Sequence, residues 1–160
     1  MSATFEDLRV LKSAEEIADS VWKIVVKWDN FAKDVVGKQI TRAADSIGAN
    51  ISESFGRYHF GEKLQFLYYA RGSLFETKYW LNRVKARNLM PDSEVQKYIE
   101  NITALAHQLN TFASGLKTVR NQETKQSKTL REIGAEYQID IAENLSGNLF
   151  DEDDIIWLQT

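Results

Sequence analysis

The chain has 160 residues and a net charge of −3, enough for one domain and hardly for two, since domains usually span ~100–150 residues. The composition is that of a soluble protein, with 43% hydrophobic residues and no apolar run near the ~18–20 residues of a membrane span. The absence of cysteine excludes disulfides, thiolate zinc sites and a cysteine nucleophile. Because the N-terminus lacks the pattern of a signal peptide, we expect a cytoplasmic protein.

Apolar residues at steps of three and four predict a helix over about residues 13–29 and a second over about 33–56. Gly48, in the middle of the second helix, indicates a place where another backbone comes close. The first seam comprises Leu11, Ala14, Ala18, Val21, Val25 and Trp28, and the second comprises Val36, Ile40, Ala43, Ala44, Ile47, Ile51 and Phe55.

The same period predicts a third helix over about 61–88 and a fourth over about 93–120, separated by a strong turn signal around Pro91. We expect the small residues Gly72 and Ser73 to face the small patch around Gly48. Four amphipathic helices with short connections favour an all-α fold, an antiparallel up-down-up-down four-helix bundle over residues 1–120 with a short C-terminal helix or acidic tail. The third seam runs from Phe60 through Leu64, Leu67, Ala70, Leu74, Thr77 and Leu81 to Val84, and the fourth contains Val95, Tyr98, Ile102, Leu105, Leu109, Phe112, Leu116 and Val119.

Residues 121–160 form an acidic C-terminal extension with three bases and nine acids, which leaves 17 bases and 14 acids in residues 1–120. Residues 1–120, with this small excess of bases, could bind nucleic acid while the acidic tail competes for the same surface. The alternative is that so small an excess of bases is unremarkable. The pattern predicts a polar linker over 121–128 and a short helix from Leu130. We expect the end of the chain to dock on its own bundle, on a neighbouring subunit or on a partner, through Phe150, Ile155, Ile156, Trp157 and Leu158.

Tests for catalytic motifs give little. His59 and His107 follow Gly56 and Ala104 by three positions, so neither completes the Glu-x-x-His pair of a di-iron bundle. The sequence also lacks a nucleophile elbow and the glycine-rich loops that hold phosphates. We therefore expect no enzyme, no metal and no cofactor.

A row of cations is the first feature that points to a function. Arg71, Lys78 and Lys85 are seven residues apart on the third helix and share one face, with Arg83 and Arg87 near its end. Such a row could follow a phosphate backbone, with nearby tyrosines as stacking rings. The alternative is a solvated face whose tyrosines pack against other helices.

Two further features suggest structural roles. An interior Asn50, paired with Arg42 or Glu76, would fix the register or oligomeric state of the bundle. The aromatic residues outside the seams indicate a second buried surface, formed by self-association or covered by the tail. These aromatic residues are Trp22, Trp28, Phe31, Phe66, Tyr69, Phe75, Tyr79 and Trp80.

Two blocks, Gln39–Arg57 (QITRAADSIGANISESFGR) and Ala70–Thr77 (ARGSLFET), resemble the four-helix-bundle proteins encoded in intervening sequences of large-subunit ribosomal RNA genes. The chain's opening, Phe5–Leu8, also fits, and the resemblance covers about residues 5–119. This family is similar in turn to the accessory variability proteins of diversity-generating retroelements. The tail after about residue 120 has no counterpart in the family pattern.

The resemblance implies a ring-shaped homopentamer, and in the retroelement relatives a basic surface binds nucleic acid and a reverse transcriptase. It implies no catalytic residue. We therefore expect an oligomeric, non-enzymatic protein that binds RNA or DNA through the third helix, or alternatively an adaptor that binds a protein partner such as a reverse transcriptase. The family's signature polar residues fall on Arg42, Asn50, Glu53, Arg57, Ser73 and Glu76.

Overall fold

The computed structural model describes residues 5–128 and 148–160, and within these ranges every regular element is helical. The long helices are α1 (Phe5–Val25), α3 (Lys38–Gly56), α4 (Phe60–Ala86) and α5 (Asp92–Lys128). A short α2 (Asn30–Ala32) and a π-helical turn, η1 (Lys33–Gly37), lead into α3, and α6 (Glu152–Gln159) lies near the C-terminus. The predicted all-α bundle with a short C-terminal helix is confirmed.

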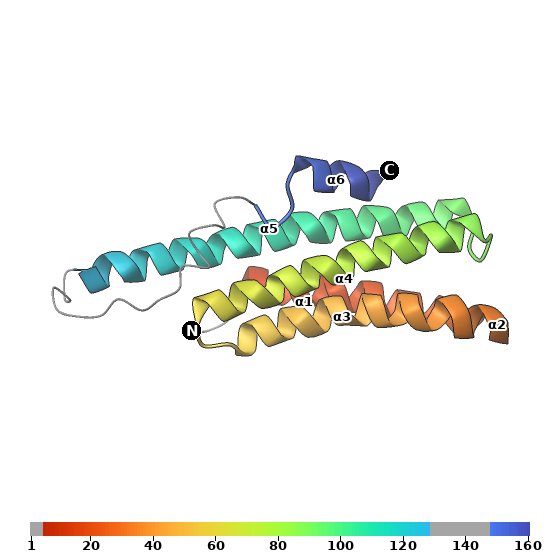
Figure 1. Cartoon of the computed structure of the whole chain (residues 1–160), viewed down its shortest axis with the longest axis horizontal. Coiled ribbons are helices and arrows are strands. Elements are labelled where there is room, and N and C mark those ends of the chain that lie inside the picture. The colour runs from red at the N-terminus through yellow and green to blue at the C-terminus, as the bar shows by residue number, and fades with distance from the viewer. Residues whose placement is uncertain (1–4, 129–147) are drawn as a thin grey trace.

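The four long helices enclose one core. Helix α1 packs against α3 and α5, and α4 packs against the same two helices from the other side (Figure 1). Short connections make consecutive helices antiparallel. The predicted seams face this core: Ala14, Ile51, Leu74 and Leu105, one from each long helix, are all completely buried.

Several helix ends differ from the prediction, among them the end of α1, which stops at Val25 rather than 29. Helix α1 begins at Phe5 rather than 13, because Val10, which is 2% exposed, extends its buried seam by a turn. The second helical segment begins at Asn30, where the Asp29 carboxylate accepts a hydrogen bond of 3.0 Å from the Ala32 amide. The predicted linker over 121–128 is wrong, since α5 continues to Lys128 through a stretch with no glycine or proline to stop it. The helix predicted from Leu130 lies outside the described residues.

The glycines set how closely α1 and the α2–α3 segment approach. A Cβ atom at Gly37 would lie 2.6 Å from Val25 Cγ1, so only glycine fits where η1 crosses the end of α1. Gly48 faces Ala14 of α1, and a Cβ atom added at Gly48 would lie 3.7 Å from the Ala14 Cβ. The prediction that Gly72 faces the small patch around Gly48 is wrong, because Gly48 is turned toward α1 and Gly72 faces open space, although Ser73 does lie 3.4 Å from Asn50 of α3.

Candidate nucleic-acid interface on helix α4

The predicted cationic row lies along α4, but one of its members is inaccessible. Lys78 is 0% exposed, and its ammonium donates a hydrogen bond of 3.1 Å to Asn82 Oδ1. Burial lowers the pKa of Lys78 below its ordinary value of 10.5, and the charge of Lys85 on the same face lowers it further. The expectation of an open row from Arg71 to Lys85 therefore fails at its centre in this arrangement.

Helix α6 is what covers this part of α4. One Nη atom of Arg71 donates to both carboxylate oxygens of Asp154, at 2.8 Å each. The Trp157 ring stacks on Phe75 with a centroid distance of 5.1 Å and an interplanar angle of 23°, and it lies 5.9 Å from the Lys78 ammonium. The acidic C-terminal segment thus occupies the first half of the predicted cationic row.

The residues before α6 anchor the segment to α4 and α5. The Asn110 side chain forms two hydrogen bonds with the Phe150 backbone, donating to its carbonyl at 2.8 Å and accepting from its amide at 2.7 Å. The Phe150 ring stacks on Phe75 at 5.9 Å. Leu149, Phe150 and Leu158 are buried, Ile155 is half-buried, and Ile156 and Trp157 stay 58% and 40% exposed. The sequence left open whether the end of the chain docks on its own bundle, on a neighbouring subunit or on a partner. In the structure it docks on its own bundle.

The second half of the row is open. Arg83 is half-buried with its guanidinium 5.6 Å from the centre of the Tyr79 ring, and Tyr79 is itself 51% exposed. Lys85 is exposed and lies 3.9 Å from the exposed carboxylate of Asp92, and Arg87 is exposed at the end of α4. These four side chains, which we call the α4 end cluster, present positive charge and one ring at the turn into α5.

Of the six polar residues that the resemblance singles out, Asn50 and Ser73 connect α3 with α4. Asn50 Nδ2 donates to the Ser46 carbonyl at 2.8 Å and lies 3.4 Å from Ser73 Oγ on α4. The expected pairing of Asn50 with Arg42 or Glu76 is wrong, because the Asn50 amide bonds to Ser46 and Ser73 instead. Glu76 instead accepts a long hydrogen bond of 3.4 Å from the Trp80 indole, and Glu53 and Arg57 form an exposed ion pair of 2.7 Å.

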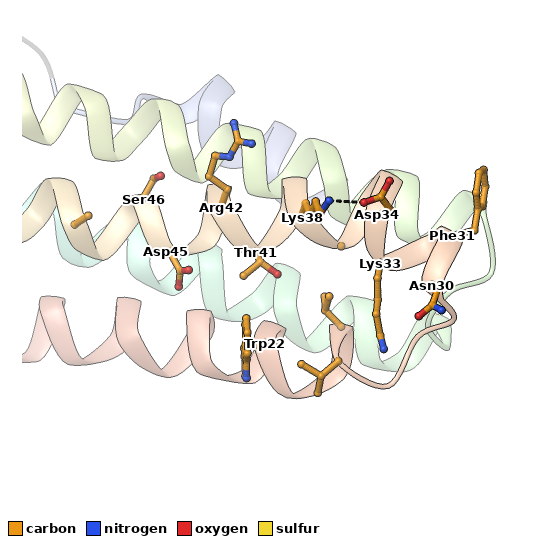
Figure 2. A pocket seen from close by; sticks show the side chains of 14 residues that line it. Trp22, Asn30, Phe31, Lys33, Asp34, Lys38, Thr41, Arg42, Asp45 and Ser46 are labelled. Atoms are coloured by element: carbon orange, nitrogen blue, oxygen red, sulfur yellow. Dashed lines mark hydrogen bonds and ion pairs between the residues drawn. The ribbon is translucent and has the colours of Figure 1, made fainter.

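An open groove lies between α1 and the α2–α3 segment (Figure 2), and it includes Trp22 and Phe31, two of the aromatic residues predicted to form a second surface. The groove itself was not predicted from the sequence. It encloses about 1100 Å³ and is lined by exposed apolar side chains, among them Trp22, Val26 and Phe31, which are 59%, 44% and 78% exposed. Asp45 points from α3 toward α1 (Figure 2), where burial raises its carboxyl pKa and the charge of Asp19 raises it further. The available signal was that Trp22 and Val26 are one turn apart and form a second apolar stripe on α1.

Within residues 5–128 and 148–160, the structure supports neither a metal site nor a membrane-spanning helix. None of the acidic and histidine side chains there gather in threes as a metal site would require. No helix in the same ranges is long and apolar enough to cross a membrane.

The fold and its surfaces define a helical-bundle protein with a cationic helix face, a docked acidic segment and an open apolar groove. The family model described as 23S rRNA-intervening sequence protein matches residues 6–111, and the chain belongs to this family. The match ends before α6, so the docked segment lies outside the part shared with the family.

A solved structure shares this fold. It is a protein of unknown function from the S23 ribosomal protein family of Bacteroides thetaiotaomicron, with a TM-score of 0.62 and 23% sequence identity. The alignment covers 69% of this chain and 99% of that one. The comparison with curated proteins found no match. The further resemblance to accessory variability proteins stays a prediction.

Proposed function

We propose that this protein is a non-enzymatic, oligomeric helical bundle that binds RNA or DNA through the cationic face of α4. One observation carries the proposal: residues 77–91 contain four cations, Lys78, Arg83, Lys85 and Arg87, and no acid. Three of these cations belong to the α4 end cluster, and the exposed Tyr79 ring lies among them.

This chemistry suits a polynucleotide backbone. Lysine and arginine side chains that replace condensed counterions bind phosphates with an affinity that falls steeply with salt, and they carry no base preference of their own. An exposed ring next to them adds stacking, which every base can provide. We therefore expect binding that is strongly salt-dependent and largely insensitive to sequence.

The test compares two triple variants of equal charge. The first, Arg83→Gln with Lys85→Gln and Arg87→Gln, removes the cations of the α4 end cluster. The control, Lys12→Gln with Lys23→Gln and Lys27→Gln, removes three exposed cations on and just after α1. Fluorescence anisotropy with a labelled mixed-sequence RNA of about 30 nucleotides, at about 50 and 200 mM KCl, gives Kd and its salt dependence.

We expect the first triple to lose at least about tenfold in affinity at low salt and to lower the salt slope by about 2–3. The control should stay within about twofold of the unaltered chain. Equal losses in the two triples would contradict a site on α4. If the unaltered chain binds neither this RNA nor a DNA duplex of the same length at low salt, the proposed function is wrong.

The open α1/α3 groove favours a second function, a scaffold that assembles with copies of itself and then with protein partners. The groove's neighbouring exposed apolar side chains, Trp22, Val26 and Phe31, are of the kind that protein interfaces bury. The rim carries both charge signs, Lys33 and Arg42 as well as Asp34 and Asp45, so charged groups of either sign on another chain find opposite partners there. The family resemblance supports the same proposal because it implies a homopentamer, and in related proteins a reverse transcriptase partner.

A further inference from the structure

We propose that Arg71 and Phe75 form a nucleotide subsite, with a phosphate on Arg71 and a base on Phe75, and that residues 148–160 occupy this subsite as an internal mimic of nucleic acid. The C-terminal segment then competes with RNA or DNA for α4. This inference rests on the proposed function and names the regulation of the same face.

The phosphate side of the subsite is the Arg71 guanidinium. One of its Nη atoms donates to both anionic oxygens of Asp154, at 2.8 Å each, so the guanidinium already holds an anion with two oxygens, as a phosphate would present. The pair is partly shielded, since the side chains of Arg71 and Asp154 are 32% and 16% exposed. An anion at this position is therefore held in a site of reduced solvent screening.

The base side is the Phe75 ring. It carries two nearly parallel rings from the C-terminal segment, Phe150 at 5.9 Å and 11° and Trp157 at 5.1 Å and 23°. Stacking on an aromatic side chain is the usual way in which proteins hold unpaired bases. Asp154 and Trp157 are three residues apart and lie on one side of α6, so one helical turn presents an anion and a flat ring together, as a nucleotide does.

Docking of α6 changes more of the α4 face than the surroundings of Arg71 and Phe75. In the docked state, Trp157 lies over Lys78, and Asp154 belongs to a run of four acids, residues 151–154, that brings negative charge to this face. Release of α6 would return the Lys78 ammonium to solvent. Arg71, Lys78 and Lys85 would then form a row with a spacing of ~10 Å along α4. Docking therefore shortens the cationic face to the α4 end cluster.

The experiment uses the full-length chain and two variants that each neutralise one acid of α6. Asp154→Asn weakens the ion pair with Arg71 and also removes the carboxylate that accepts from the Asp151 amide in the capping box of α6. Asp153→Asn is the matched control, because Asp153 is exposed and has no hydrogen bond or ion pair with any residue of the described ranges. The probe is the labelled RNA of about 30 nucleotides.

We expect Asp154→Asn to bind the RNA about three- to tenfold more tightly and Asp153→Asn to stay within about twofold of the unaltered chain. Adding Arg71→Gln or Phe75→Leu to Asp154→Asn should abolish the gain. Equal affinities of Asp154→Asn and the unaltered chain would overturn the inference. A gain that survives both second substitutions would also overturn it.

A second measurement follows α6 directly. Because the chain has no cysteine, Gln159→Cys provides a single thiol on the exposed side of α6 for a nitroxide label. Saturating RNA should increase the mobility of this label in electron paramagnetic resonance spectra. RNA binding without a change in mobility contradicts the competition but leaves the proposed function standing. If no variant binds RNA, both the proposed function and this inference are wrong.

Discussion

At the scale of single residues, Lys78 is the most unusual feature of this protein. A fully buried ammonium loses its hydration, and the partners the structure gives it are the Asn82 amide oxygen and the Trp157 ring, neither of them charged. Its pKa is lowered by this burial and by Lys85. The charged Lys78 ammonium therefore lowers the free energy of unfolding while α6 is docked. Deprotonation of the side chain removes this cost.

Replacing Lys78 with methionine should stabilise the protein by about 1 kcal/mol or more at neutral pH, because a thioether of similar length fills the site without charge. Between the lowered pKa and 10.5 the folded chain binds fewer protons than the unfolded chain, so the unfolding free energy of the unaltered protein rises with pH through this window. Lys78→Met lacks this increase. Urea unfolding at neutral and alkaline pH measures both effects.

The control for Lys78→Met is Lys12→Met, which removes an exposed lysine of α1 and should change stability by less than about 0.5 kcal/mol. A loss of stability in Lys78→Met larger than in the control would contradict the cost assigned to the buried ammonium.

The sequence predicted which cations share a face but not which of them is covered. The spacing of Arg71, Lys78 and Lys85 is a local property of one helix, so periodicity was sufficient to predict it. The covering residue Asp154 is 83 positions from Arg71 in the sequence. No periodic pattern links such distant segments, and the acidic, apolar end of the chain indicated only that it would dock somewhere.

At the scale of elements, the interiors of the helices were predictable and their ends were not. Seams such as Ile47–Ile51 and Leu105–Leu109 are buried as predicted, because burying an apolar stripe stabilises each helix more than intrinsic propensity does. Helix ends depend on weaker terms, among them the cap by Asp29. The π-helical turn over 33–37 has no signature in the apolar pattern, since it adjusts the phase of the helix to a neighbour.

Two glycines give a matched test of this element packing. Gly37→Ala should destabilise the protein by about 1–3 kcal/mol, because the new Cβ would lie 2.6 Å from the stiff, buried Val25 side chain. Gly72→Ala, on the exposed side of α4 with no atom within 4 Å of the new Cβ, should stabilise it by about 0.5–1 kcal/mol. Thermal unfolding followed by circular dichroism gives both values. Similar shifts for the two variants would contradict the close approach of η1 to α1.

At the scale of the whole molecule, the surplus of aromatic residues divides between two surfaces. The tail covers Phe75 on the α4 side, as one of the two expected explanations requires. Trp22 and Phe31 remain exposed at the α1/α3 groove, which residues 148–160 do not line. Because residues 148–160 dock on α4 instead, we propose that a second copy of the chain covers Trp22 and Phe31.

Self-association through the groove predicts a solution mass that is a multiple of that of the 160-residue chain. Trp22→Lys combined with Phe31→Lys should shift the protein to the monomer, because each places a charge where apolar area would be buried between copies. Tyr58→Lys is the control, since Tyr58 is 91% exposed at the turn between α3 and α4 and does not line the groove. Sedimentation velocity measures the masses. A monomeric unaltered chain, or a double variant that keeps the larger mass, would show that the groove is not the interface between copies.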